Sequence, residues 1–214
     1  MRDDLSRIPI MSIEIELKLS FPADALPEIT RHPLIASAPR KGEPETLDNT
    51  YFDTPSLMLK AHGVGLRLRR QAGGMVQTIK CSAAQSINGL TRRPEWETPW
   101  RGHFDFSAVT DAAVAALLTR VQNELIPVFT TRFFRDVRHI QPRPGVYILA
   151  MIDTGFIKAG ENDAPIHELE LELVEGDEDE LVRLAEDLRK TLPLAFENVS
   201  KAQRGYKLAA MLSR

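Results

Sequence analysis

The sequence is poor in the residues and segments that build several common kinds of site. It contains a single cysteine, Cys81, among 214 residues, which excludes a disulfide framework and any cysteine-rich zinc site. Its longest wholly apolar run, Ala112 to Leu118, is too short to span a bilayer. Residues 1–10 lack the apolar core of a signal peptide. We therefore expect a cytoplasmic protein without a membrane partner.

The sequence also lacks the features of three further classes: zinc enzymes with histidine motifs, aspartic proteases and proteins that bind a nucleic acid duplex. The five histidines show no zinc-binding spacing such as HExxH. The aspartic-protease tripeptide Asp153-Thr154-Gly155 occurs once, whereas that mechanism needs two copies or a dimer. With 27 basic and 30 acidic residues the formal charge is −3, unlike the broad basic surfaces that bind a nucleic acid duplex. These three classes of protein are therefore not expected.

Charges of opposite sign are concentrated in separate parts of the chain. Residues 60–93 contain no acidic residue and seven basic residues: Lys60, Arg67, Arg69, Arg70, Lys80, Arg92 and Arg93. Residues 161–187 contain twelve acidic residues and one basic residue, Arg183. The near-zero net charge therefore hides a strong segregation of charge. No repeat, low-complexity tract or linker divides the chain, so we expect one domain.

Alternation of apolar and charged residues predicts strands that carry one charged face. In residues 12–20, Glu14, Glu16 and Lys18 alternate with isoleucines and leucines. Further strands are predicted at residues 64–70, 75–81, 93–97, 129–138, 145–152 and 166–174. Within residues 93–97, Pro94 favours an edge position or the start of a strand.

Helical periodicity occurs in three segments, at residues 107–119, 178–191 and 201–212, the last two with Asp177 and Ser200 as predicted N-caps. The apolar stripe of residues 178–191 predicts core packing, with a homodimer contact as the alternative. Short turns join the strands and no regular β-α-β rhythm is present. The sequence therefore predicts an α+β protein with a mostly antiparallel sheet.

The charged strand faces allow two interpretations. They could be the solvated face of a half-covered sheet, or glutamates and arginines that simply form salt bridges. Yet Glu168, Glu170 and Glu172 crowd one strand face, which is unfavourable unless something neutralises them. A sheet curled with its charged faces inward and its apolar faces under helices would create a lumen with both signs of charge. Such a lumen suits a polyanion bound together with a divalent cation.

The same segments resemble a known family. Glu14-Ile15-Glu16-Leu17-Lys18 is similar to the ExExK signature of the CYTH superfamily, the triphosphate tunnel metalloenzymes. The resemblance continues in order through Tyr51 to Pro55, Gly65 to Arg69, Gln77 to Lys80, Arg93 to Glu95, Ile152 to Gly155, Glu168 to Glu172, and Ser200 to Ala202. It implies a closed eight-stranded antiparallel β-barrel with a charged lumen and helices packed outside. It also implies an N-terminal extension over residues 1–11 and a single CYTH domain over residues 12–214.

The resemblance implies metal-dependent hydrolysis of inorganic triphosphate to pyrophosphate and phosphate, because the later motifs are most similar to bacterial inorganic triphosphatases. Thiamine triphosphatase, class IV adenylate cyclase and a non-catalytic polyphosphate or nucleotide binder are the alternatives. The implied cofactor is Mg²⁺ or Mn²⁺, and the implied partner is a small molecule that contains a triphosphate. Bacterial members often continue into a helical CHAD domain, for which 214 residues leave no room.

The resemblance also assigns roles to individual residues. The expected triphosphate-binding residues are Lys18, Arg67, Arg69, Lys80, Arg132 and Lys201. The expected metal ligands are Glu14, Glu16, Asp153, Glu168, Glu170 and Glu172, with Glu168 and Glu170 favoured among the last three. Lys18, Glu14 and Glu16 are expected to act in catalysis, and Arg93, Glu95 and Glu97 to support the site. Water held by glutamates would attack the terminal phosphorus while basic side chains neutralise the phosphate chain.

Overall fold

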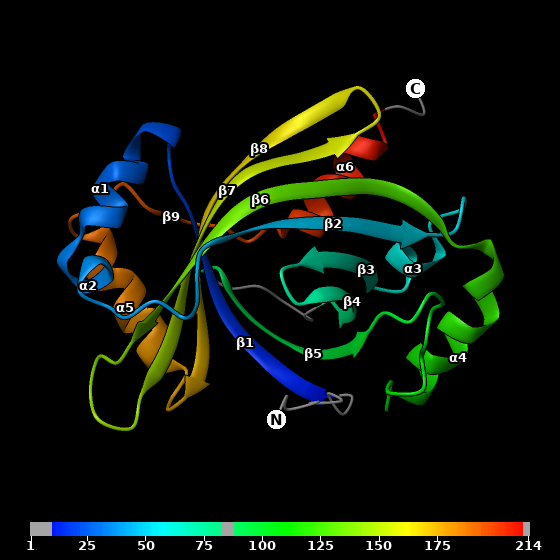
Figure 1. Cartoon of the computed structure of the whole chain (residues 1–214), viewed down its shortest axis with the longest axis horizontal. Coiled ribbons are helices and arrows are strands. Elements are labelled where there is room, and N and C mark those ends of the chain that lie inside the picture. Colours follow the sequence, from blue (N-terminus) through cyan, green and yellow to red (C-terminus); the bar gives the residue numbers. More distant parts are fainter. Residues whose placement is uncertain (1–9, 83–87, 212–214) are drawn as a thin grey trace.

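The computed structural model describes residues 10–82 and 88–211, which form a closed antiparallel barrel (Figure 1). Its eight strands are β1 (Ile10–Ser20), β2 (Glu45–Asp53), β3 (Val64–Gln71), β4 (Gly74–Cys81), β5 (Leu90–Pro99), β6 (Ile126–Ile140), β7 (Tyr147–Ala159) and β8 (Asn162–Glu175). Their hydrogen-bonded order is β5-β4-β3-β2-β6-β7-β8-β1, and β1 also pairs with β5, so the sheet closes on itself. The short strand β9 (Ala195–Phe196) pairs with the far end of β1.

The two-residue alternation of the strands decides which side chains enter the barrel. In β1, Leu17 and Leu19 are buried in an apolar cluster while Lys18 between them lines the interior cavity. In β3, Leu66 packs into another apolar cluster while Arg67 lines the same cavity. Because successive strand residues point to opposite faces, the apolar faces turn outward and the charged faces inward. The predicted barrel with a charged lumen is confirmed.

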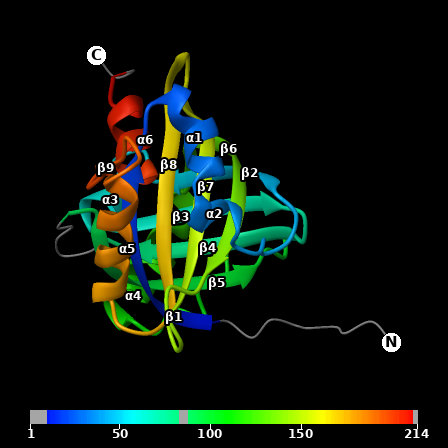
Figure 2. The same ribbon diagram turned by 90° about the vertical axis from the view of Figure 1, so that its left-hand side faces the viewer.

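Helices cover the outer apolar faces at two places. The first cover consists of α1 (Leu26–Arg31), α2 (Pro33–Ala36) and α5 (Asp179–Arg189), which lie over the half of the barrel shown in Figure 2. The apolar stripe of α5 is buried there, as its predicted role in core packing requires: Leu181, Leu184, Ala185 and Leu188. The second cover is α4 (Ala112–Val121), which packs with α3 (Met58–Ala61) on β3, β4 and β5.

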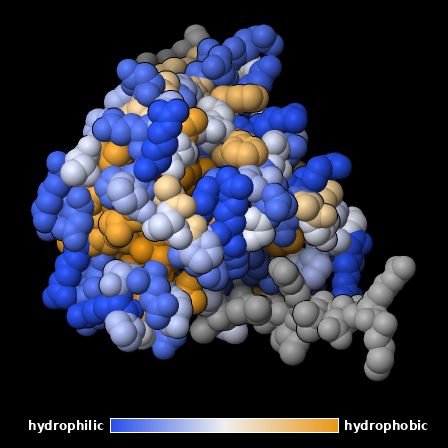
Figure 3. Space-filling view, turned by 60° about the vertical axis from the view of Figure 1, so that its left-hand side comes forward, coloured by the Kyte–Doolittle hydropathy of each residue, from blue (hydrophilic) through white to orange (hydrophobic). Residues whose placement is uncertain are grey.

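Short 3-10 turns precede α1 and follow α4, at η1 (Ala23–Ala25) and η2 (Gln122–Glu124). The side of the molecule shown in Figure 3 is largely hydrophilic and also exposes an apolar patch, which is orange in the left-hand part of the view. In the described part of the chain, no helix is both long enough and apolar enough to cross a membrane.

The last helix, α6 (Lys201–Ala209), packs against the inner face of the barrel wall. It contacts β6, β7 and β8. Its Tyr206 meets the ring of Phe129 edge to face at 5.1 Å, in a cluster that includes Phe133. Phe129 and Phe133 alternate in β6 with exposed residues, so this cluster marks the inner face. The predicted N-cap, Ser200, accepts a hydrogen bond from the backbone N–H of Gln203. The helix therefore closes part of the lumen and brings Lys201 to it.

Several boundaries differ from the sequence-based prediction. Strand β2 was not predicted, because its inner face mixes polar Asn49 with aromatic Tyr51 and shows no clean alternation. Pro94 lies inside β5 rather than at its start, at the point where pairing with β4 ends, so its missing N–H leaves no gap in that ladder. The N-cap of α5 is Glu178, although Asp177 still accepts from the N–H of Asp179 at 3.0 Å.

The ends of the expected domain are only partly described. Most of the expected extension over residues 1–11 lies outside the described residues, and β1 begins at Ile10. The predicted final helix ends at Ala209, and residue 212 lies outside the described part.

A substitution at Gly155, where β7 packs closely on β6, tests the packing of the barrel wall. A Cβ on Gly155 would overlap the backbone of Arg132 and Phe133, which cannot move aside as a flexible side chain could. We expect Gly155→Ala to lower the free energy of unfolding by about 1–3 kcal/mol in denaturant titrations. Gly73→Ala is the matched control, because a Cβ there would meet no atom within 4 Å. Equal stability of the two variants would contradict this account of the wall.

Candidate functional site

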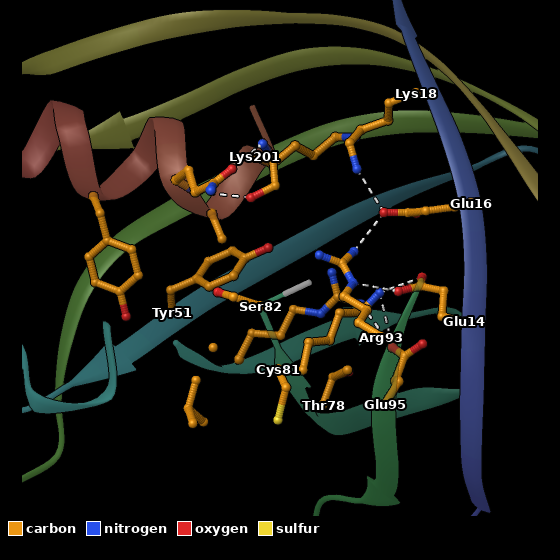
Figure 4. Close-up of a pocket in the computed structure, with 18 of the residues that line it drawn as sticks. Glu14, Glu16, Lys18, Tyr51, Thr78, Cys81, Ser82, Arg93, Glu95 and Lys201 are labelled. Atoms are coloured by element: carbon orange, nitrogen blue, oxygen red, sulfur yellow. Dashed lines mark hydrogen bonds and ion pairs between the residues drawn. The ribbon is translucent and has the colours of Figure 1, made fainter. Parts of the chain in front are cut away.

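A cavity of about 670 Å³ lies inside the barrel, within the size range of small-molecule sites (Figure 4). Its charged lining comes from six strands and two helices: Glu14, Glu16, Lys18, Lys60, Arg67, Arg69, Lys80, Arg93, Glu95, Glu97, Arg135, Glu170, Glu172, Lys201 and Lys207. The cavity therefore brings together all of the predicted site residues except three, namely Arg132, Asp153 and Glu168.

Strand register explains why residues distant in sequence meet here. Glu14 of β1 lies opposite Arg93 of β5. On the other side of β1, Glu16 lies opposite Glu172, and Lys18 lies opposite Glu170. Residues directly opposite in an antiparallel pair point to the same face of the sheet. Strand β1 therefore brings its charged face between those of β5 and β8.

The β1 carboxylates are held by basic side chains from neighbouring strands (Figure 4). Glu14 accepts hydrogen bonds from Lys80 Nζ at 2.6 Å and from Arg93 Nε at 2.8 Å. Glu16 accepts from Arg93 at 2.6 Å and from Lys18 at 2.7 Å. Burial acts to raise the pKa of Glu14, but the charges of Lys80 and Arg93 outweigh it and lower the pKa. Glu14 is therefore ionised at neutral pH.

A second network surrounds Lys201 at the start of α6. Its Nζ lies 2.9 Å from Asp153, 2.5 Å from Glu168 and 2.8 Å from Glu170. Arg135 bridges two of these carboxylates, at 2.5 Å from Asp153 and 2.7 Å from Glu170. Burial acts to raise the pKa of Glu170, but the charges of Lys201 and Arg135 hold it well below its usual value. This network holds the side chains of Lys201 and Arg135 at the cavity wall.

Two arginines in the cavity have hydrogen-bonding capacity that the described residues do not use. Burial acts to lower the pKa of Arg67, but Tyr51, Glu95 and Glu97 outweigh it and raise the pKa. The buried Nε of Arg67 has no hydrogen-bond partner among the described residues, and its ion pair with Glu95 spans 3.9 Å. Arg69 donates to the side-chain oxygen of Asn49 at 2.9 Å and makes no ion pair with a described carboxylate. Burial and the positive charges of Arg67 and Arg135 lower the pKa of Arg69 to about 10. A bound anion would stabilise both guanidinium groups.

Glu172 is the acidic counterpart of these arginines. Its carboxylate forms no hydrogen bond or ion pair with any residue that the structure describes, although the side chain lines the cavity. Burial and the negative charges of Glu14, Glu95 and Glu16 raise the pKa of Glu172 to about 7. A bound cation would relieve this repulsion and favour the ionised form.

Carboxylate oxygens are the ligands that Mg²⁺ and Mn²⁺ prefer. Within the described ranges, no group of three or more Asp, Glu, His or Cys side chains is already arranged to hold a metal ion. Glu172 nevertheless fits a cation, because it lacks a partner and lies opposite Glu16, with Glu14 also close enough to raise its pKa. The carboxylates of Glu14 and Glu16 would have to turn partly from their basic partners to share it.

The prediction that Arg132 faces the tunnel is wrong. Its side chain is 61% exposed on the outer face of β6 and lies 3.5 Å from Asp48. Arg135, three residues later, points inward because strand residues an odd number apart face opposite sides. Sequence alternation could not choose between them, since both faces of β6 carry aromatic and basic residues.

Two predicted metal ligands also lie elsewhere. Asp153 and Glu168 have no exposed surface and do not line the cavity; they hold Lys201 from behind. Glu168 is further bound by Arg204 at 2.6 Å. The geometry therefore does not support the choice of Glu168 rather than Glu172 as a metal ligand, because α6 covers the part of β8 that contains Glu168.

Sequence reasoning also missed Tyr51. Its ring stacks on Phe129 at 4.4 Å, and it lies opposite Arg67 in the pairing of β2 with β3. Burial acts to raise the pKa of Tyr51, but the charges of Arg67, Arg69 and Lys80 outweigh it and lower the pKa. Tyr51 belongs to the Tyr51 to Pro55 motif and precedes a basic strand in the sequence, and these two features could have indicated that it faces the cavity.

Comparisons with known proteins identify the family to which the chain belongs. The CYTH domain model matches residues 12–206. An inorganic triphosphatase of Haemophilus influenzae is 31% identical over 204 residues, which cover 94% of this chain. The chain spans only 56% of the length of that relative.

Solved structures share the fold at low sequence identity. A Hippeastrum protein, proposed as an adenylyl cyclase and described as having a dominant triphosphatase activity, matches with a TM-score of 0.61 and 20% identity, over 91% of this chain and 95% of its own. A proposed adenylate cyclase of Bacillus halodurans matches with a TM-score of 0.57 and 19% identity, over 91% of this chain and 97% of its own. The family expected from the motifs is confirmed: the chain belongs to the CYTH domain family.

Proposed function

We propose that this chain hydrolyses inorganic triphosphate to pyrophosphate and phosphate with the help of Mg²⁺ or Mn²⁺. The observation that carries the proposal is that one cavity contains two arginines with unused hydrogen-bonding capacity and a carboxylate without a partner among the described residues: Arg67, Arg69 and Glu172. A triphosphate bound with a divalent cation supplies both missing charges. The name of the Haemophilus influenzae relative supports this choice of substrate.

The basic side chains would bind and neutralise the phosphate chain. Arginine forks can donate two hydrogen bonds to one phosphate group, and buried charges act more strongly than exposed ones. Arg67 and Arg69 extend from the same strand face two residues apart, so adjacent phosphoryl groups can contact both. Lys80, Arg135 and Lys201 add charge from three other elements. Neutralisation of the phosphate oxygens is the main requirement for attack on a highly charged phosphorus.

The carboxylates of Glu172, Glu14 and Glu16 would hold the metal. A divalent cation bound there supplies charge neutralisation and a water of lowered pKa. The chain itself would orient the attacking water through its lumen carboxylates and hold the substrate through its arginines. In the reaction the water oxygen forms a bond to the terminal phosphorus, the phosphoanhydride bond breaks, pyrophosphate leaves, and the water proton passes to solvent or to the released phosphate.

Loss of one cavity arginine tests the binding role. We expect Arg67→Ala to lower kcat/KM for tripolyphosphate by about a hundredfold, because a donor to developing charge is removed. Arg132→Ala is the matched control, since this arginine lies on the outer face and should leave activity unchanged. Phosphate release should be measured for tripolyphosphate, thiamine triphosphate and ATP, together with cyclic AMP formation. Equal activity of the two variants would contradict the site, and cyclic AMP from ATP would replace the proposed reaction.

Chelation and a metal titration test the cofactor. We expect EDTA to abolish activity and added Mg²⁺ or Mn²⁺ to restore it. Glu172→Gln should raise the metal concentration for half-maximal activity about tenfold, because a charged ligand is lost. Glu175→Gln on the same strand is the control, since Glu175 is exposed and does not line the cavity. Activity that persists after chelation would rule out the metal-dependent mechanism.

A further inference from the structure

A buried carboxylate at the end of β2 has no role in the proposed reaction. Asp53, in the Tyr51 to Pro55 motif, has no exposed surface and does not line the cavity. It forms no ion pair with any residue that the structure describes. A buried carboxylate is costly unless an opposite charge or hydrogen bonds stabilise it. The hydrogen bonds of Asp53 must therefore offset the cost of its burial.

Four donors surround the Asp53 carboxylate. Its Oδ1 accepts from the backbone N–H groups of Thr54 and Leu59 at 2.7 and 2.8 Å. Its Oδ2 accepts from the backbone N–H of Lys60 and from the Tyr206 hydroxyl, both at 2.9 Å. Leu59 and Lys60 belong to α3, whereas Tyr206 belongs to α6. Asp53 therefore joins α3 and α6 through one rigid group.

The Tyr206 side chain is held in place as a donor to Asp53. Burial and the charge of Asp53 raise the pKa of Tyr206, so the phenol is protonated at neutral pH. The Tyr206 ring packs on Phe129, and a Cβ on the preceding residue, Gly205, would overlap the Phe129 ring. Helix α6 therefore lies so close to β6 that Tyr206 has little freedom to move away from Asp53.

Helix α6 is attached to the barrel on two sides. Lys201 and Arg204 both donate hydrogen bonds to Glu168 of β8. Tyr206 donates instead to Asp53 of β2. Tyr206 lies about 7.5 Å along the helix axis from Lys201, at a rise of about 1.5 Å per residue. The attachment to β8 alone would let the helix pivot about Lys201, and the bond to Asp53 opposes that movement.

We propose that Asp53 is a positioning residue, which fixes α6 through the Tyr206 hydroxyl and so places the ammonium group of Lys201 for contact with the triphosphate. This inference rests on the proposed function. Asp53 acts through other residues because it does not itself line the cavity, whereas Lys201 does. A misplacement of about 1 Å in a group that contacts the reacting atoms can lower the rate strongly. The alternative is a cap for α3 alone, which would leave Lys201 unaffected.

The test is a double-mutant cycle between Tyr206 and Lys201, measured in the hydrolysis of tripolyphosphate. We expect Tyr206→Phe to lower kcat about tenfold and to change KM less than about twofold, because the placement of a group at the reacting centre is lost. Lys201→Ala alone should lower kcat about a hundredfold. Because Tyr206 acts through Lys201, the double variant should be no slower than Lys201→Ala.

Two further variants complete the experiment. Asp53→Asn replaces one acceptor by a donor, so kcat should fall at least as far as in Tyr206→Phe. Tyr147→Phe is the matched control, since Tyr147 is an exposed tyrosine of β7 outside the cavity, and kcat should not change. Tyr206→Phe should melt within about 4 °C of the wild type, because one hydrogen bond is lost from a folded chain. If Asp53→Asn does not fold, the cycle between Tyr206 and Lys201 decides alone.

Two kinetic results would overturn the inference. Losses that multiply to about a thousandfold in the double variant would show that Tyr206 acts independently of Lys201. An unchanged kcat in Tyr206→Phe would show that Lys201 does not need this attachment. If the wild-type chain releases no phosphate from tripolyphosphate, the proposed function fails, and amide hydrogen exchange of residues 201–209 decides the attachment of α6 separately. Faster exchange in Tyr206→Phe than in Tyr147→Phe supports the attachment, and equal exchange contradicts it.

Discussion

Compensation of buried charge inside a closed barrel is the constraint on which the rest of this structure depends. A buried ion is costly unless an opposite charge or hydrogen bonds stabilise it. Most lumen charges meet this condition directly: Arg93 bridges Glu14 and Glu16, and Lys201 is surrounded by three carboxylates. Arg69 and Glu172 meet it least, and Arg67 keeps a buried Nε without a hydrogen-bond partner among the described residues. The incompletely compensated groups therefore mark where a ligand that carries both signs of charge would stabilise the protein.

The fold can tolerate such a lumen because its apolar burial lies elsewhere. Leu17, Leu19 and Leu66 face outward under helices, so the strands have a dry outer face and a charged inner face. Closure by the pairing of β1 with β5 removes the open edges and surrounds the charges with protein. Helix α6 completes the wall from inside, where Tyr206 packs on Phe129 and Lys201 enters the network. The outer faces of the strands thus stabilise the fold through apolar burial, and the inner faces of the same strands form the candidate site.

The sequence predicted those parts of the site that strict alternation places unambiguously. Charged residues alternate with leucine and isoleucine in two strands, so one face of each strand is charged: Glu14, Glu16, Lys18, Arg67 and Arg69. Like charges crowded on one strand face are unfavourable unless they are neutralised, and this favours a sheet that curls so that faces of opposite charge meet. Alternation failed where both faces were mixed. In β6 it could not separate Arg132 from Arg135, and in β8 it could not show that α6 would cover Glu168 and leave Glu172 accessible. Whether a residue of β8 is covered depends on its contacts with α6, a helix distant in the sequence, and the alternation within the strand carries no information about those contacts.

In the proposed reaction, one cavity binds an anion and a cation together, and each increases the affinity for the other. The most direct measurement is calorimetric titration of tripolyphosphate at several fixed concentrations of free Mn²⁺, corrected for formation of the metal–triphosphate complex in solution. We expect the affinity for the triphosphate to increase with free Mn²⁺, and Glu172→Gln to weaken this dependence. An affinity that is independent of Mn²⁺, or that falls as Mn²⁺ rises, would contradict it.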